Sequence, residues 1–224
     1  MNLSDTLPLF ARWSVDLTAA QRDRVLADIA VQQVAAGAAV CRKGEPVDSW
    51  IGVLDGLVKI ASSAPDGRAM TFTGVPAGGW FGEGSLLKHE PRKYDVTALR
   101  ASRIARLPRA TFEWLLDTSI PFNRYVLIQL NERLSQFLAR MEYERLLNPD
   151  AKLARTLADL FNPLLYPGSG PRLEISQAEL ALLVGVSRQR ANQSLRVLED
   201  AGLLAVEYGA IRVLNLEGLR SYGS

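Results

Sequence analysis

The sequence of 224 residues has a single cysteine, Cys41, and no long apolar run. One cysteine excludes an internal disulfide and fits a reducing cytoplasm, which is where we expect the protein. No apolar stretch approaches the length that spans a bilayer, and the first residues lack the basic and then apolar pattern of a secretion signal. We therefore expect a cytoplasmic protein with no membrane partner.

Motifs of common enzymes are also missing. The sequence has no P-loop and no nucleophile elbow. A jelly-roll oxygenase, the enzyme alternative, needs two or more histidines beside a carboxylate, whereas His89 is the only histidine here. We expect no enzymatic activity. The net charge of +2 does not indicate a nucleic-acid partner by itself, because a whole-chain sum hides local patches.

The first half of the chain predicts a helix and then a β domain. Thr18 is a plausible N-cap for an amphipathic helix within the first thirty residues. Between residues 31 and 108, short runs rich in β-branched and aromatic residues are separated by glycines. Asp55-Gly56 and Asp66-Gly67 are strong hairpin signals. Together these features predict a β-barrel or jelly roll.

From about residue 108 to 146 the sequence is helical, and Asn148-Pro149 marks a break after it. Apolar residues recur here three and four positions apart, which is the spacing of a coiled-coil seam. We expect the seam to join two copies as a parallel homodimer. Packing on the helix's own domain is the alternative, and Ile128 and Leu138 lie off the seam. The seam residues are Leu127, Leu130, Leu134, Phe137 and Met141.

Residues 174–204 predict two short helices joined by a tight turn. Ser176 and Glu179 have the capping-box spacing that starts a helix. Gly185 suits the left-handed turn that ends it, and Ser187 suits the N-cap of the second helix. This pattern is typical of a DNA-binding helix-turn-helix. The second helix has an apolar stripe of Ala191, Leu195 and Leu198, with Ser194 where an apolar residue is usual.

The polar face of the second helix can read DNA bases. Arginine pairs with guanine, and asparagine or glutamine pairs with adenine, through two hydrogen bonds. No acidic residue occurs from residue 185 to 198, although residues 171–204 hold four basic and four acidic residues. A solvated polar surface is the alternative. The candidate DNA-binding residues are Arg188, Gln189, Asn192 and Gln193, with Ser187, Arg190 and Ser176, and Arg190 is expected on a phosphate.

The stretch "LLAVEYGAIRVLNL" reads as two strands around Gly209. Beside a helix-turn-helix, such a hairpin would form a wing. Arg212 would then contact a phosphate or simply lie at a sheet edge.

This order of parts, and the stretch "ISQAELALLVGVSRQRANQSLRVLEDAGLL", resemble the family of the cyclic-AMP receptor protein and the FNR oxygen regulator (CRP/FNR) over nearly the whole chain. The resemblance implies an α+β fold: a cyclic-nucleotide-binding-like β-barrel sensor domain over residues 1–118, a dimerisation helix over 119–146 and a winged helix-turn-helix domain over 147–224. It implies a homodimer that binds palindromic double-stranded promoter DNA and regulates transcription, with RNA polymerase as a further partner.

By the same resemblance, "FGEGSLLKHEPRKYD" is a phosphate-binding cassette. Gly82 would let backbone amides approach the phosphate, Glu83 would accept from the ribose, and Arg92 would pair with the phosphate. Ser85 and Lys93 complete the candidate ligand-binding residues.

The cassette departs from the family pattern in two places. Small residues follow the arginine in family members that bind cyclic nucleotides, but Lys93, Tyr94 and Asp95 stand there in this chain. Phe137 and Leu138 occupy the positions of the Thr-Ser pair that binds adenine in cyclic-AMP receptors. We therefore expect a different effector or none, and a cyclic nucleotide held in the usual way is the alternative.

Other effectors of the family require protein ligands that the sequence does not provide. An iron–sulfur cluster needs several thiolates, so Cys41 alone argues against one. His89 lies in a loop, where a solvated side chain is the ordinary outcome, so no haem is expected. A redox role for Cys41 has no local support. A third hypothesis, a ligand-binding module that acts only through protein partners, is opposed by the intact helix-turn-helix.

Overall fold

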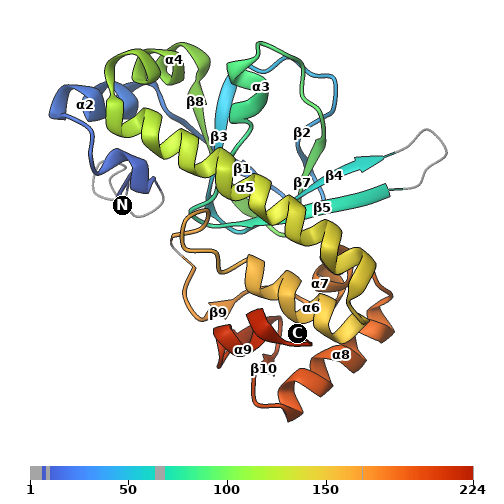
Figure 1. Cartoon of the computed structure of the whole chain (residues 1–224). Coiled ribbons are helices and arrows are strands. Elements are labelled where there is room, and N and C mark those ends of the chain that lie inside the picture. Colours follow the sequence, from blue (N-terminus) through green and yellow to red (C-terminus); the bar gives the residue numbers. More distant parts are fainter. Residues whose placement is uncertain (1–6, 9–10, 64–68, 168, 224) are drawn as a thin grey trace.

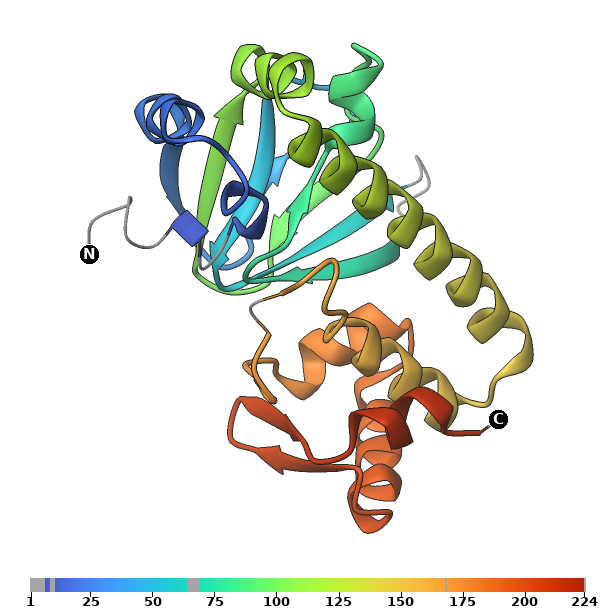
Figure 2. The ribbon, with the colours of Figure 1, turned by 60° about the vertical axis from the view of Figure 1, so that its left-hand side comes forward.

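The computed structural model describes residues 7–8, 11–63, 69–167 and 169–223. A β domain lies at one end of the molecule, and a smaller, mostly helical domain lies at the other (Figure 1). The long helix α5 (Ile120–Leu146) crosses the β domain and leads to the helical domain. Figure 2 shows the same arrangement from a second direction. Within the described residues, no helix is long and apolar enough to cross a membrane.

Two four-stranded antiparallel sheets form the β domain, which confirms the predicted jelly roll. Asp55-Gly56 makes the turn between β3 (Ser49–Asp55) and β4 (Leu57–Ser63), where Gly56 has φ 94°. Asp66-Gly67 lies outside the described residues. One sheet has the order β1 (Ala30–Val34), β8 (Ser102–Pro108), β3 (Ser49–Asp55) and β6 (Trp80–Phe81). The other has the order β2 (Ala39–Cys41), β7 (Asp95–Ala98), β4 (Leu57–Ser63) and β5 (Ala69–Pro76).

The outer face of the first sheet carries the N-terminal helices and a cluster of aromatic rings. The cap predicted at Thr18 is confirmed, because Thr18 and Gln21 form a capping box at the start of α2 (Ala19–Asp28). Trp50 and Trp80 lie with ring centroids 4.6 Å apart, and Phe122 in the first turn of α5 packs against Trp50. These rings anchor the start of α5 to the β domain. The short helices η1 (Arg12–Ser14) and α4 (Arg109–Thr118) cover the same cluster.

The helical stretch predicted after residue 108 consists of two helices. α4 ends at Thr118, and the side chain of Ser119 caps α5. α5 ends at Leu146, and Asn148 caps the next helix, α6 (Pro149–Asp159), by accepting from two backbone amides. The break predicted at Asn148-Pro149 is therefore present.

The C-terminal domain packs its helices around one apolar core. The predicted hairpin is present as β10 (Leu204–Glu207) and β11 (Ala210–Val213). A two-residue strand that the sequence did not indicate, β9 (Arg172–Leu173), pairs with β11. The helices are α6, α7 (Gln177–Val184), α8 (Arg188–Asp200) and α9 (Leu216–Ser221).

Candidate functional site

The helix-turn-helix has the local geometry that its sequence predicts. Ser176 Oγ accepts from the Glu179 amide at 3.2 Å, and the Glu179 carboxylate accepts from the Ser176 amide in return. Gly185 adopts φ 75° after α7, a conformation that costs a residue with a Cβ atom. Ser187 Oγ accepts from the Arg190 amide at 3.2 Å and so caps α8.

The core face of α8 is buried as predicted, and Ser194 belongs to it. Ala191, Leu195 and Leu198 are at most 1% exposed. Ser194 is fully buried among them, and its hydroxyl has no hydrogen-bond partner among the described residues. A polar atom therefore takes the place of an apolar one at this packing position.

The outward face of α8 carries Gln189, Gln193 and Arg196, all exposed. A helix turns about 100° per residue, so positions i, i+4 and i+7 share one face. Arg196 was not among the candidate DNA-binding residues, although its spacing from Gln189 could have indicated it. Asn192 is only half-exposed.

Arg190 points elsewhere. Its guanidinium pairs with Asp150 in the first turn of α6, with an N–O distance of 2.7 Å. The side chain thus ties α8 to α6 in this structure. Ser176, another candidate, is half-buried and is occupied by the capping box.

A groove of about 480 Å³ separates the start of α7 and Arg188 from the hairpin. Tyr208 and Gly209 form the tip of the hairpin, and Tyr208 is fully exposed. Glu207 lies between Arg172 and Arg212, each at 2.7 Å, so its negative charge is compensated. Tyr208 is a second surface residue that the sequence reasoning missed, because an aromatic residue in a turn gives no distinctive signal.

The cassette folds around a short helix, α3 (Glu83–Leu87). Gly82 precedes it with φ 95°, and a Cβ atom at Gly82 would lie 2.8 Å from Arg92 Nη1. The left-handed backbone therefore favours glycine here, and a Cβ atom would also force the Arg92 guanidinium to shift. Arg92 is 4% exposed and donates to the Ser49 carbonyl at 3.1 Å.

Glu83 is buried and already has two partners. Its carboxylate accepts from Arg133 Nε on α5 at 2.9 Å and from Trp50 Nε1 at 3.3 Å. Arg133 also donates to the Trp80 carbonyl. Burial disfavours the charged guanidinium, but the charge of Glu83, its hydrogen bond to Arg133 and the nearby Tyr166 and Tyr94 together outweigh this effect, so the pKa of Arg133 lies above its ordinary value.

A cavity of about 320 Å³ lies between the cassette and α5. Four of the five candidate ligand-binding residues line it, and Arg92 is not among them. Asp95 also lies away from it, because its carboxylate accepts from the Lys43 amide at 2.9 Å. The residues that line the cavity are Ile60, Phe72, Thr73, Gly82, Glu83, Gly84, Ser85, Lys88, Lys93, Tyr94, Leu130, Arg133, Leu134 and Phe137.

The exposed apolar residues of α5 form a stripe that differs from the predicted seam. Leu127, Leu134 and Met141 are each more than half exposed, and so is Leu138, which was expected off the seam. Leu130 is only partly exposed and packs against the aromatic cluster. Phe137 lines the cavity. Ile120 and Leu146 extend the stripe to both ends of the helix.

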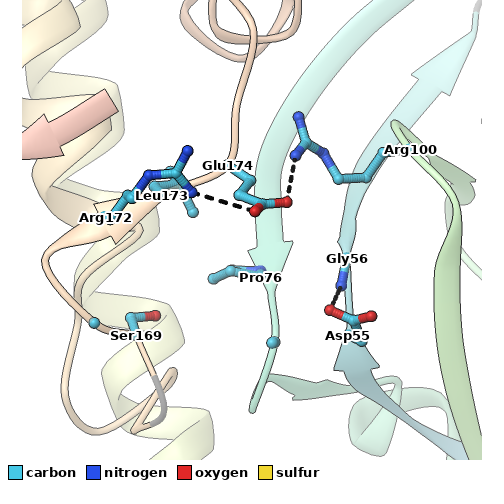
Figure 3. Close-up of a pocket in the computed structure, with 10 residues that line it drawn as sticks. Asp55, Gly56, Pro76, Arg100, Ser169, Arg172, Leu173 and Glu174 are labelled. Atoms are coloured by element: carbon cyan, nitrogen blue, oxygen red, sulfur yellow. Dashed lines mark hydrogen bonds and ion pairs between the residues drawn. The ribbon is translucent and has the colours of Figure 1, made fainter. Parts of the chain in front are cut away.

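The two domains meet through charged side chains (Figure 3). Arg100, in the loop after β7, pairs with Glu174 at 3.3 Å and with Glu179 at 2.9 Å. Arg172 pairs with the same Glu174 at 3.2 Å. On the α5 side, Arg140 donates to the carbonyls of Phe72 on β5 and Leu183 on α7.

The residues considered for redox or haem chemistry have ordinary surroundings. Cys41 is buried in β2, and burial raises the pKa of its thiol, so the reactive thiolate is disfavoured. His89 is exposed, and its Nδ1 lies 3.2 Å from Arg109 Nη1. Across the described part of the chain, no three His, Cys, Asp or Glu residues are grouped to hold a metal ion.

Both domains are similar to known families. Residues 31–119 match the cyclic nucleotide-binding domain, and residues 151–222 match the Crp-like helix-turn-helix domain. The transcriptional regulator SdrP of Thermus thermophilus is 32% identical, with 78% of this chain and 84% of that protein covered. The CRP-like cAMP-activated global transcriptional regulator of Mycobacterium tuberculosis is 29% identical, with 82% and 83% covered.

Solved structures share the architecture. The c-di-GMP responsive global regulator CLP of Xanthomonas campestris is 26% identical with a TM-score of 0.61, covering 88% of this chain and 99% of that one. FixK2 of Bradyrhizobium japonicum, at 16% identity, shares the fold with a TM-score of 0.72, covering 88% of this chain and 98% of that one. The chain belongs to the CRP/FNR family of transcription regulators.

Proposed function

We propose that this chain is a dimeric regulator that binds palindromic promoter DNA in a sequence-specific manner through α8. The observation that carries the proposal is the outward face of α8, where Gln189, Gln193 and Arg196 are exposed. None of these side chains has an ion-pair partner among the described residues. Side chains of these types can form paired hydrogen bonds with base edges in the major groove.

The hairpin supports the same function. With Tyr208 at its tip, it stands across a groove from Arg188. Compensation of Glu207 by two arginines removes a charge that would repel phosphates. The hairpin would therefore contact the DNA backbone while α8 enters the major groove.

The stripe on α5 supports a homodimer. Monomeric proteins rarely expose a continuous apolar surface of this kind. Two parallel α5 helices would cover the stripe and place two copies of α8 on one side of the dimer. Half-sites in the DNA should then lie about one helical turn apart, roughly 10 bp between centres.

We further propose that the effector of the sensor domain is not a cyclic nucleotide bound in the usual way. Glu83, the expected ribose acceptor, is occupied by Arg133 and Trp50. Effectors also differ among similar proteins, since one is named for cAMP and another for c-di-GMP. An effector can change DNA binding only by binding one arrangement of the dimer more tightly than another.

Recovery of bound genomic fragments tests the main proposal. The purified protein is mixed with fragmented genomic DNA, and the bound fragments are sequenced. We expect a shared two-fold-symmetric motif, and the absence of any shared motif would contradict the proposal. Calorimetry with cyclic AMP, cyclic GMP and cyclic di-GMP tests the effector statement, and we expect no binding stronger than the millimolar range.

A further inference from the structure

We propose that the cavity between the cassette and α5 binds an organic monoanion with an aromatic body. The inference rests on the proposed function, because it names the kind of effector to which the sensor domain would respond. Three features of the cavity carry it: its occupied polar floor, its apolar walls and its surplus of positive charge.

The carboxylate in the polar floor of the cavity is buried and already paired. Glu83 is 3% exposed, and the hydrogen bonds from Arg133 and Trp50 occupy one carboxylate oxygen each. Each oxygen keeps a second lone pair, but a ribose hydroxyl could use it only by reaching a carboxylate that is 3% exposed and already held by two donors. Arg133 is held in place by the Trp80 carbonyl as well.

The walls favour a flat apolar group. Phe72, Tyr94 and Phe137 contribute rings from β5, the cassette and α5, and Ile60 and Leu130 also line the cavity. A purine would bring polar edges against these side chains, and polar edges without partners weaken binding. Burial raises the pKa of Tyr94 to about 12, so its hydroxyl stays neutral and does not repel an anion.

Positive charge collects at one end. Lys88 and Lys93 both line the cavity and share a single carboxylate, Glu90, at 3.1 and 2.8 Å. One lysine charge is therefore uncompensated. Arg92 is buried beneath Gly82 and is not among the residues that line the cavity, so the lining carries this one surplus charge. A single negative charge on the ligand would balance this end of the cavity.

A fluorescent aromatic sulfonate, 1-anilinonaphthalene-8-sulfonate, is the probe. It is titrated into the full-length dimer, where α5 is covered, and then displaced by three competitors. We expect 1-naphthoate to displace it at concentrations roughly tenfold lower than cyclic AMP or the neutral 1-naphthalenemethanol. The proposal is overturned if cyclic AMP competes as well as 1-naphthoate, or if the neutral alcohol does.

Gly84→Leu locates the binding. A Cβ atom at Gly84 meets nothing within 4 Å, so the new side chain can extend into the cavity without a clash at its base. We expect roughly tenfold weaker probe binding. Gly170→Leu is the matched control, since its Cβ atom also meets nothing within 4 Å. Equal probe binding by the Gly84→Leu variant and the wild type would place the probe elsewhere and overturn the proposal.

A second variant, in which the charge of the cavity is changed, tests the proposal if the Gly84→Leu variant does not fold. Replacement of both Lys88 and Lys93 by glutamine should weaken 1-naphthoate binding about fivefold at low salt and leave 1-naphthalenemethanol unchanged. No change for 1-naphthoate would overturn the proposal. These titrations contain no DNA, so their failure would leave the recovered DNA motif standing, and a missing motif would not remove saturable probe binding.

Discussion

At the scale of single residues, the side chains on α8 fall into two groups: those that contact the rest of the domain and those that are exposed to solvent. Arg190 pairs with Asp150 inside the domain, whereas Gln189 and Arg196 extend into solvent. Neighbouring residues on one helix therefore have different roles, which depend on the face of the helix each one occupies.

Substitutions on the two faces of α8 should have different effects: one should change the preference for a DNA base, and the other should change the stability of the domain. We expect Gln189→Ala to relax sequence preference at one position per half-site, at a cost of about 1–3 kcal/mol for the preferred base. Arg190→Ala should instead lower the free energy of unfolding by up to about 1 kcal/mol and leave the preferred motif unchanged. Binding to a library of motif variants, together with urea unfolding, measures both effects. A changed motif for Arg190→Ala would contradict this assignment.

A second residue, Asp159, should make stability depend on pH. Burial raises its pKa to about 7, and Arg140 and Arg155 only partly oppose this. The folded chain then holds a proton that the unfolded chain releases at lower pH. This contribution is present below about pH 4 and is lost as the pH rises through 7.

We expect Asp159→Asn to reduce the loss of stability between pH 5 and pH 8 by about 1–2 kcal/mol, as measured by urea unfolding at both pH values. Asp200→Asn, at the exposed end of α8, is the control and should keep the slope of the wild type. An unchanged slope in Asp159→Asn would count against a neutral Asp159 at pH 5.

At the scale of elements, local signals were reliable and long-range ones were not. The caps at Thr18, Ser176 and Ser187 and the turn at Gly185 depend on residues within a few positions, so the sequence predicted them. The pairing of Glu83 with Arg133 joins residues 50 positions apart, and no local pattern indicates it.

The seam on α5 shows the same limit. Its three-four spacing predicted an apolar helix face, but the β domain determines which residues on that face remain free. Leu130 packs against the aromatic cluster, so Leu138 takes its place on the exposed stripe. Spacing identifies the apolar side of a helix, whereas the partner of each residue depends on tertiary packing.

The proposed dimer should dissociate when a charged residue is placed in the stripe. We expect Leu138→Glu to convert the dimer to a monomer at micromolar concentration, because each protomer would bury an unpaired carboxylate at the contact. Sedimentation equilibrium measures the mass. Leu164→Glu, which changes a residue of similar exposure away from α5, should remain dimeric. A dimeric Leu138→Glu variant would show that the interface lies elsewhere.

At the scale of the whole molecule, the sensor and DNA-binding domains share a contact made from both sides of α7. Arg100 approaches its first turn through Glu179, and Arg140 reaches its last turn at the Leu183 carbonyl. Leu183 also packs on Gly74 of β5, where a Cβ atom would lie 2.9 Å away. In this structure the orientation of the helix-turn-helix is therefore held by contacts with the β domain and with α5.

Arg100→Ala should loosen this contact. Loss of its ion pairs to Glu174 and Glu179 should weaken docking by about 1 kcal/mol, and amide hydrogen exchange in α7 should become roughly fivefold faster. Mass spectrometry of exchanged peptides measures the rate. Arg212→Ala removes an ion pair in the hairpin away from the sensor domain and should leave α7 exchange unchanged. Equal exchange in both variants would mean that apolar packing alone holds the domains together.

Glu179 has a consequence for how this protein can change over evolutionary time. The same carboxylate caps α7, through the Ser176 amide, and holds Arg100 of the sensor domain. Glutamine could keep the cap but not the ion pair. Every other substitution at Glu179 would remove the side-chain cap of α7 together with the ion pair, so changes in docking that leave α7 intact should arise mostly at Arg100 or Glu174.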